Sequence, residues 1–99
     1  MYRARWSSAD QGYQGAVVPY APLQLDPSAQ VLNYGQSVFE GMKAQRSAKD
    51  NVVLFRPDRN AARCAAGAAR LSMPAVPEEQ FVRAVKETVA ANAAWVPPR

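Results

Sequence analysis

The 99-residue sequence has no histidine and only one cysteine, Cys64. Without histidine the chain cannot form a Ser-His-Asp triad or a histidine metal site, and we expect no metal ligands. One cysteine allows no internal disulfide, and a lone helical cysteine is more often a small buried apolar residue than a redox sensor. No apolar run approaches the ~20 residues of a membrane span, and no secretory signal is readable.

The composition of the chain indicates a small globular domain. Hydrophobic residues make up 48% of the chain, which is too apolar for disorder. The net charge is +4, but the basic residues are dispersed along the chain. Dispersed charge is more typical of a solvated surface than of a nucleic-acid interface. We therefore expect no nucleic-acid partner and no membrane partner.

Alternation and turn residues predict short antiparallel strands. The predicted segments are a strand-like start at 2–6, a polar loop at 7–15, a strand end or edge at 16–20, a turn at 26–28, and a hairpin made of 38–46, the five-residue loop 47–51 and 52–55. Gly41 interrupts the strand predicted at 38–46. Such a glycine marks either a β-bulge or a close approach by a ligand or another backbone.

Two helices are predicted after the hairpin. Pro57 and Asp58 begin the first, which runs to Arg70, and Pro77 followed by two glutamates begins the second. The residues expected to pack are Ala62, Ala65, Ala66 and Ala69 in the first helix, and Phe81, Val82, Val85 and Val89 in the second, with Trp95 extending that packing. The sequence therefore predicts an α+β fold in which a meander of short antiparallel strands packs with two helices.

Four blocks of sequence together resemble one family. They are LNYGQSVFEGMKA at 32–44, LFRPDRNAAR at 54–63, ARLSMP at 69–74 and WVPP at 95–98. In this order they are similar to the N-terminal small domain of branched-chain amino-acid aminotransferases, which are class IV pyridoxal-phosphate enzymes. The resemblance implies one domain over 1–99, incomplete at both ends, with 96–99 starting the interdomain linker and the large domain absent.

The resemblance also implies a reaction and its site residues. Such enzymes transfer the amino group between leucine, isoleucine or valine and 2-oxoglutarate, using pyridoxal 5'-phosphate. Arg63 matches the arginine that contacts the cofactor phosphate; the alternative is a surface arginine. Phe39 and Tyr34 match substrate-pocket aromatics, and this tyrosine reaches the neighbouring subunit's site in a homodimer; the alternative is ordinary packing. Gly41 would leave room for cofactor and substrate.

No catalytic residue is expected within the chain. By resemblance, the Schiff-base lysine and the acid that pairs with the cofactor ring nitrogen belong to the large domain. Lys43 is therefore expected to be structural, Lys49 to lie in a turn and Lys86 on a polar helix face, and Glu40 is not that acid. Alone, the chain is expected to be inactive.

Other readings of the function stay open. The alternatives are another type IV enzyme, such as a D-amino-acid aminotransferase or an aminodeoxychorismate lyase, a truncated non-catalytic paralogue, or a small basic binding module. A soluble protein of the cytoplasm, a mitochondrion or a plastid is expected.

Overall fold

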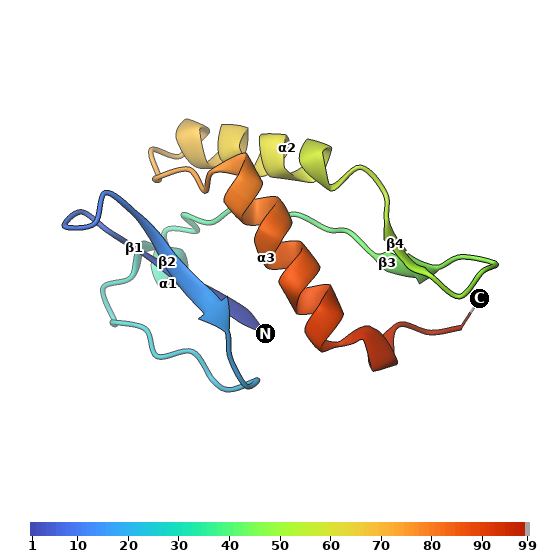
Figure 1. Cartoon of the computed structure of the whole chain (residues 1–99). Coiled ribbons are helices and arrows are strands. Elements are labelled where there is room, and N and C mark those ends of the chain that lie inside the picture. The colour runs from blue at the N-terminus through green and yellow to red at the C-terminus, as the bar shows by residue number, and fades with distance from the viewer. Residues whose placement is uncertain (99) are drawn as a thin grey trace.

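The computed structural model describes residues 1–98; Arg99, the last residue of the predicted linker start, lies outside the described residues. Figure 1 shows two separate hairpins and two long helices. In chain order the elements are β1 (Tyr2–Ser7), β2 (Gly12–Val17), α1 (Gln30–Asn33), β3 (Ala44–Arg46), β4 (Val52–Leu54), α2 (Pro57–Arg70), α3 (Glu78–Ala91) and the 3-10 turn η1 (Ala93–Trp95). The predicted α+β class is confirmed, although the antiparallel strands form two hairpins rather than one meander.

The sequence predicts strand-like segments at 2–6 and 16–20 but no pairing between them, whereas the structure pairs β1 with β2 in a hairpin. Strand β2 begins at Gly12, so most of the predicted loop 7–15 is strand, and only residues 8–11 form the turn. Gly15 faces Ala4 in the register, and a Cβ there would lie 2.7 Å from the Ala4 Cβ and 2.7 Å from the Tyr2 ring. Glycine is needed at position 15 because the two strands approach closely there, whereas the polar, glycine-containing composition of residues 7–15 indicates a loop.

The predicted strand over 38–46 is wrong except at its end. Only Ala44–Arg46 pairs with another strand, Val52–Leu54, and the five-residue connection 47–51 is confirmed. Residues 36–43, hereafter the arm, run along α2 instead: the Gln36 amide donates to the Leu71 carbonyl, and Val38 contacts the helix at Gly67. Gly41 therefore lies outside any strand pairing, and it forms no bulge.

Helix α2 begins at Pro57, as predicted, after Arg56 in the left-handed conformation with φ of 48°. Its buried residues are Asn60, Ala61 and Ala68. Of the predicted alanine stripe, Ala62 and Ala65 are half-buried as expected, whereas Ala66 and Ala69 are exposed, so that half of the prediction was wrong. Alanines occur on every face of α2, so their spacing does not identify the face that packs. The buried face is the one that contacts α3 and the arm.

Helix α3 packs on α2 and on the first hairpin through its half-buried residues Phe81, Val82, Val85 and Val89, which confirms the predicted stripe. Trp95 was wrongly expected to extend this packing, because it is 85% exposed in η1. No helix within residues 1–98 is both long and apolar enough to cross a bilayer.

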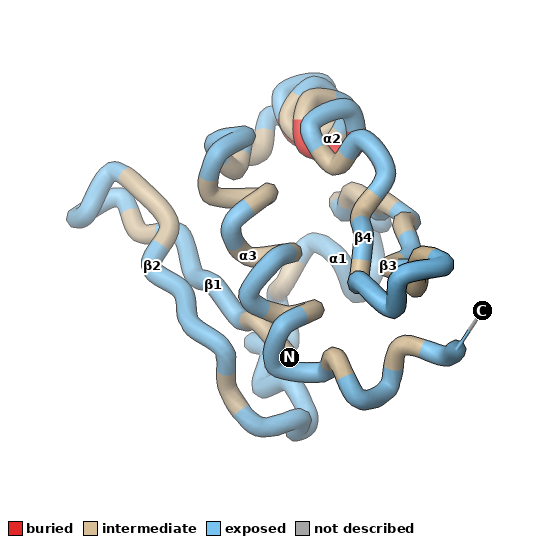
Figure 2. Tube along the Cα trace, turned by 45° about the vertical axis from the view of Figure 1, so that its right-hand side comes forward, coloured by how far each residue is buried: buried red, intermediate tan, exposed pale blue. Residues whose placement is uncertain are grey.

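The buried core of this fold is small. Within the described residues only Ala61 and Ala68 are buried apolar residues, and Figure 2 colours almost every other residue as exposed or intermediate. The accessible surface is 7831 Å², whereas a self-contained protein of this mass exposes about 5,500 Å². The surplus includes many large apolar side chains: Tyr20, Leu23, Leu25, Leu32, Tyr34, Phe39, Phe55 and Trp95. The fold therefore leaves much apolar surface available for contact with other protein.

Candidate functional site

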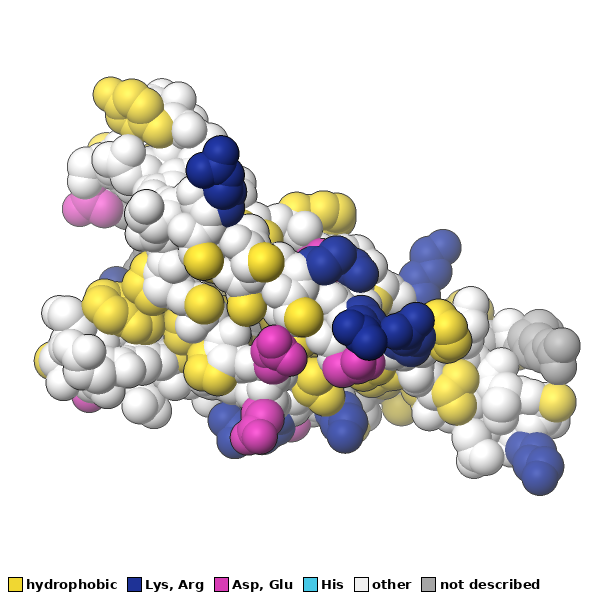
Figure 3. All heavy atoms as spheres, turned by 90° about the horizontal axis from the view of Figure 1, so that it is seen from above, with side chains coloured by type: hydrophobic (Ala, Val, Ile, Leu, Met, Phe, Trp, Pro, Cys, Tyr) yellow, Lys and Arg dark blue, Asp and Glu magenta, His cyan; other side chains and the backbone are white. Residues whose placement is uncertain are grey.

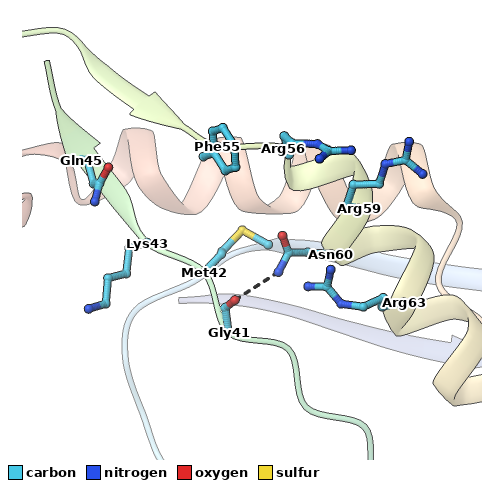
Figure 4. A pocket seen from close by; sticks show the side chains of 9 residues that line it. All are labelled: Gly41, Met42, Lys43, Gln45, Phe55, Arg56, Arg59, Asn60 and Arg63. Carbon is cyan, nitrogen blue, oxygen red and sulfur yellow. Dashed lines mark hydrogen bonds between the residues drawn. The ribbon is translucent and has the colours of Figure 1, made fainter.

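A hollow of about 730 Å³ lies between the arm with the start of β3 and the N-terminal half of α2. Its lining residues, drawn in Figure 4, are Gly41, Met42, Lys43, Gln45, Phe55, Arg56, Arg59, Asn60 and Arg63. Four of these nine are basic and none is acidic. Basic side chains also gather on the face seen from above in Figure 3. The hollow therefore has the charge to attract an anion.

Arg63 is held in the wall of this hollow by Glu40 of the arm. Its Nε donates to Glu40 Oε1 at 2.9 Å and its Nη2 donates to Oε2 at 2.8 Å. The hydrogen bond from Arg63 holds the pKa of the Glu40 carboxyl below its usual range, and the bond to Glu40 in turn raises the pKa of Arg63. This paired geometry fixes the plane of the guanidinium.

Asn60 holds the same carboxylate with a second hydrogen bond. It is 7% exposed, and its Nδ2 donates to Glu40 Oε2 at 2.7 Å and to the Gly41 carbonyl at 3.1 Å. One buried amide thus ties the arm to α2 at two successive residues. The position of Arg63 follows from this network, because Glu40 cannot turn away without breaking the bond from Asn60.

The guanidinium of Arg63 keeps donors for a ligand. Its Nη1 has no hydrogen-bond partner in the part of the chain that the structure describes, and the side chain is 61% exposed. In Figure 4, Arg63 reaches from α2 toward the arm, and Arg56 and Arg59 stand at the start of the same helix. A guanidinium that keeps free N–H donors beside a hollow lined by further basic residues matches the chemistry of a phosphate group. The donor set therefore fits the phosphate of pyridoxal 5'-phosphate.

The structure brings two of the four predicted site residues together. Arg63 and Gly41 line the hollow, whereas Tyr34 and Phe39 do not. Tyr34 is 80% exposed directly after α1, and Phe39 is 90% exposed on the arm. A Cβ at Gly41 would meet the Phe39 ring at an ordinary 3.8 Å, so no described residue of this chain requires glycine there.

The three lysines and Cys64 lie where the sequence placed them. Lys43 is exposed at the rim of the hollow and points away from Arg63 in Figure 4, Lys49 lies in the turn of the second hairpin, and Lys86 is exposed on α3. Cys64 is half-buried on α2, where burial, and then the charge of Glu40, raise the pKa of its thiol. A raised pKa keeps this thiol protonated and unreactive.

Sequence reasoning missed most of this network. Arg56, Arg59 and Arg63 recur at helical spacing, which is a readable signal for a basic helix face. Glu40 lies 23 residues before Arg63 and gives no such signal. Asn60 is polar yet buried, so the apolar pattern of the helix could not identify it.

Comparison with known proteins identifies related chains. The chain is 50% identical over 92 residues to a branched-chain-amino-acid aminotransferase from Mycolicibacterium smegmatis, covering 92% of this chain and 25% of the relative. It is 50% identical to the chloroplastic branched-chain-amino-acid aminotransferase 2 of Arabidopsis thaliana, and 46% identical to the methionine aminotransferase BCAT4 of the same plant. Each plant match covers 99% of this chain, and 25% and 28% of the respective relative. No protein-family model matches. The chain thus spans about a quarter of the length of these relatives.

Proposed function

We propose that this chain is a segment of a branched-chain-amino-acid aminotransferase and serves as the small domain of such an enzyme. The complete enzyme would exchange the amino group between leucine, isoleucine or valine and 2-oxoglutarate. Besides sequence similarity, one structural observation supports this proposal: two hydrogen bonds from Arg63 to the Glu40 carboxylate hold the guanidinium in the wall of a basic hollow. A small domain needs such a positioned donor to share a cofactor with the rest of the enzyme.

Arg63 would hold the phosphate of pyridoxal 5'-phosphate. Glu40 uses Nε and one donor of Nη2, so the remaining donors of the guanidinium face the hollow without losing their orientation. When bound, the cofactor supplies the electron sink for amino transfer. The contribution of this chain is to orient the cofactor and to neutralise its phosphate charge.

Tyr34, Phe39 and Gly41 would act on the substrate side. Tyr34 and Phe39 are exposed aromatics that do not line the hollow of their own chain. This exposure supports their use by a second subunit in a homodimer, where apolar rings would select aliphatic side chains by burial. One relative is named a methionine aminotransferase, and an apolar slot of this kind also suits methionine's unbranched side chain.

By itself the chain would not catalyse transamination. None of Lys43, Lys49 and Lys86 combines burial with a place facing the arginines. The exposed surface exceeds that of a self-contained protein by roughly 2,300 Å². This surplus is more than the ~800 Å² that one partner contributes to a standard interface, which supports docking against further protein. We place the enzyme in the cytoplasm or an organelle, which fractionation of the native cells would test.

A chimera tests the proposed function. This chain would replace the matching segment of the Mycolicibacterium relative, and transamination of leucine with 2-oxoglutarate would be measured beside activity on D-alanine and lyase activity on aminodeoxychorismate. Leucine activity supports the proposal. A folded chimera that acts on D-alanine or aminodeoxychorismate instead would favour another type IV enzyme. A folded chimera with no activity on any substrate would contradict an enzymatic role.

A further inference from the structure

Arg46 links two parts of the chain that are distant in sequence, the second hairpin and the segment after α3. From β3, its Nη2 donates to the Ala93 carbonyl at 2.9 Å and its Nε donates to the Val96 carbonyl at 3.1 Å. Its Nη1 reaches the Asp50 side chain at 3.2 Å and the Asp50 carbonyl at 3.3 Å, inside its own hairpin. The side chain is only 21% exposed. A single guanidinium thus joins the hairpin turn to the segment that follows α3.

These two carbonyls differ in their other partners. The Ala93 carbonyl also accepts from the Val96 N–H at 3.2 Å, whereas the Val96 carbonyl, just after η1, has Arg46 as its hydrogen-bond donor within the described residues. A cationic side chain satisfies such carbonyls and interacts favourably with the negative end of the helix. Arg46 therefore caps this end of the molecule from a strand almost 50 residues away in sequence.

The second hairpin depends on this link. Within residues 1–98, β3 and β4 have extensive contacts only with each other, whereas α3 packs extensively on α2, β1 and β2. An apolar gap of about 430 Å³ separates β4 from the end of α3 and is lined by Val52, Leu54 and Val89, among others. Side-chain packing across this gap is incomplete, and the hydrogen bonds of Arg46 are polar contacts that join β3 to the segment after α3.

The hairpin is also part of the hollow. Gln45 of β3 lines the hollow next to Lys43, and residues 43–46 line a second hollow together with Pro97 and Pro98. We propose that Arg46 is a positioning residue: it clamps the β3–β4 hairpin to the turn after α3 and so holds one wall of the basic hollow in place. The importance of this wall for a cofactor rests on the proposed function, but the clamp itself does not.

Hydrogen exchange on the 99-residue chain tests the clamp. In Arg46→Gln, we expect the amides of Ser47, Trp95 and Val96 to exchange at least tenfold faster, because each closes a turn at one end of the clamp. The amides of α2 and of β1–β2 should keep their rates. In Arg46→Lys, the exchange rates of these amides should lie between those of the unaltered chain and those of Arg46→Gln. A single ammonium cannot reach all the acceptors that three different nitrogens of Arg46 now bond. Arg83→Gln, at an exposed arginine of α3, is the matched control.

Two results would overturn the proposal. One is unchanged exchange at Ser47, Trp95 and Val96 in both Arg46 variants. The other is uniform acceleration over the whole chain, which would make Arg46 a general stabilising residue rather than a clamp. If Arg46→Gln does not fold, Asp50→Ala keeps the test open: it removes one hydrogen bond of the clamp and should accelerate Ser47 while leaving Trp95 and Val96 protected. None of these readouts involves the cofactor, so failure of the proposed function would not affect them.

Discussion

Gly67→Ala probes the contact that brings Glu40 to Arg63. A Cβ at this position of α2 would lie 3.2 Å from Val38 Cγ1 and 3.4 Å from Cγ2, so the arm would have to move by a few tenths of an ångström. In a free helix the change stabilises by about 1 kcal/mol, because glycine has the greater backbone entropy when unfolded. Overpacking a contact typically costs about 1–3 kcal/mol. We therefore expect Gly67→Ala to be neutral or to destabilise by up to about 2 kcal/mol.

The same substitution should change sign when the arm is trimmed. In a Val38→Ala background the obstructing methyl groups are absent, and Gly67→Ala should stabilise by about 1 kcal/mol. The coupling between the two positions is then about 1–3 kcal/mol, measured as a double-mutant cycle by urea unfolding followed by helix circular dichroism. Ala66→Gly, at an exposed position beside it in α2, gives the propensity difference in the same helix. Equal stabilisation by Gly67→Ala in both backgrounds would refute the packing of the arm on α2.

Three further substitutions and conditions test the site. Asn60→Ala removes two hydrogen bonds and leaves the Gly41 carbonyl without its donor, so urea unfolding should show a loss of about 1–3 kcal/mol; a neutral effect would contradict the network. The pKa of Glu40 is lowered in the folded chain, so its stabilisation is complete above the ordinary carboxyl range and is lost as the pH falls through the folded value. Glu40→Gln should flatten this dependence of the unfolding free energy on pH, and an unaltered dependence would contradict the Glu40–Arg63 pair. Burial raises the pKa of the Cys64 thiol, so an aromatic disulfide reagent near neutral pH should react at least tenfold more slowly with the folded chain than with the urea-unfolded chain; equal rates would disprove the burial.

Local chemistry made some elements predictable. The five-residue polar turn gave the second hairpin, and prolines followed by acidic residues gave the starts of α2 and α3. Elements that depend on distant partners were not predictable in this way. Residues 38–43 alternate like a strand, but their neighbour is a helix, and Gly15 looks like a loop residue until Tyr2 and Ala4 are seen across from it.

The same difference between local signals and long-range packing applies to the residues of the site. The sequence resemblance selected Arg63 and Gly41, which the fold brings to one hollow. Glu40 and Asn60 hold Arg63 from 23 and three residues away, and only the packing of the arm reveals that they do so. The roles of Tyr34 and Phe39 depend on protein outside this chain, so they stay predictions.

The affinity of the chimera for pyridoxal 5'-phosphate tests the central claim most directly. Cofactor would be removed, and rebinding would be titrated by absorbance for the unaltered chimera, for Arg63→Met and for Arg70→Met. Arg70 is an exposed arginine at the end of the same helix, so its substitution controls for the loss of one charge. The account predicts at least a tenfold loss of affinity for Arg63→Met and not for Arg70→Met, because Arg63 lines the hollow and Arg70 does not. Equal affinities for the two variants would contradict it.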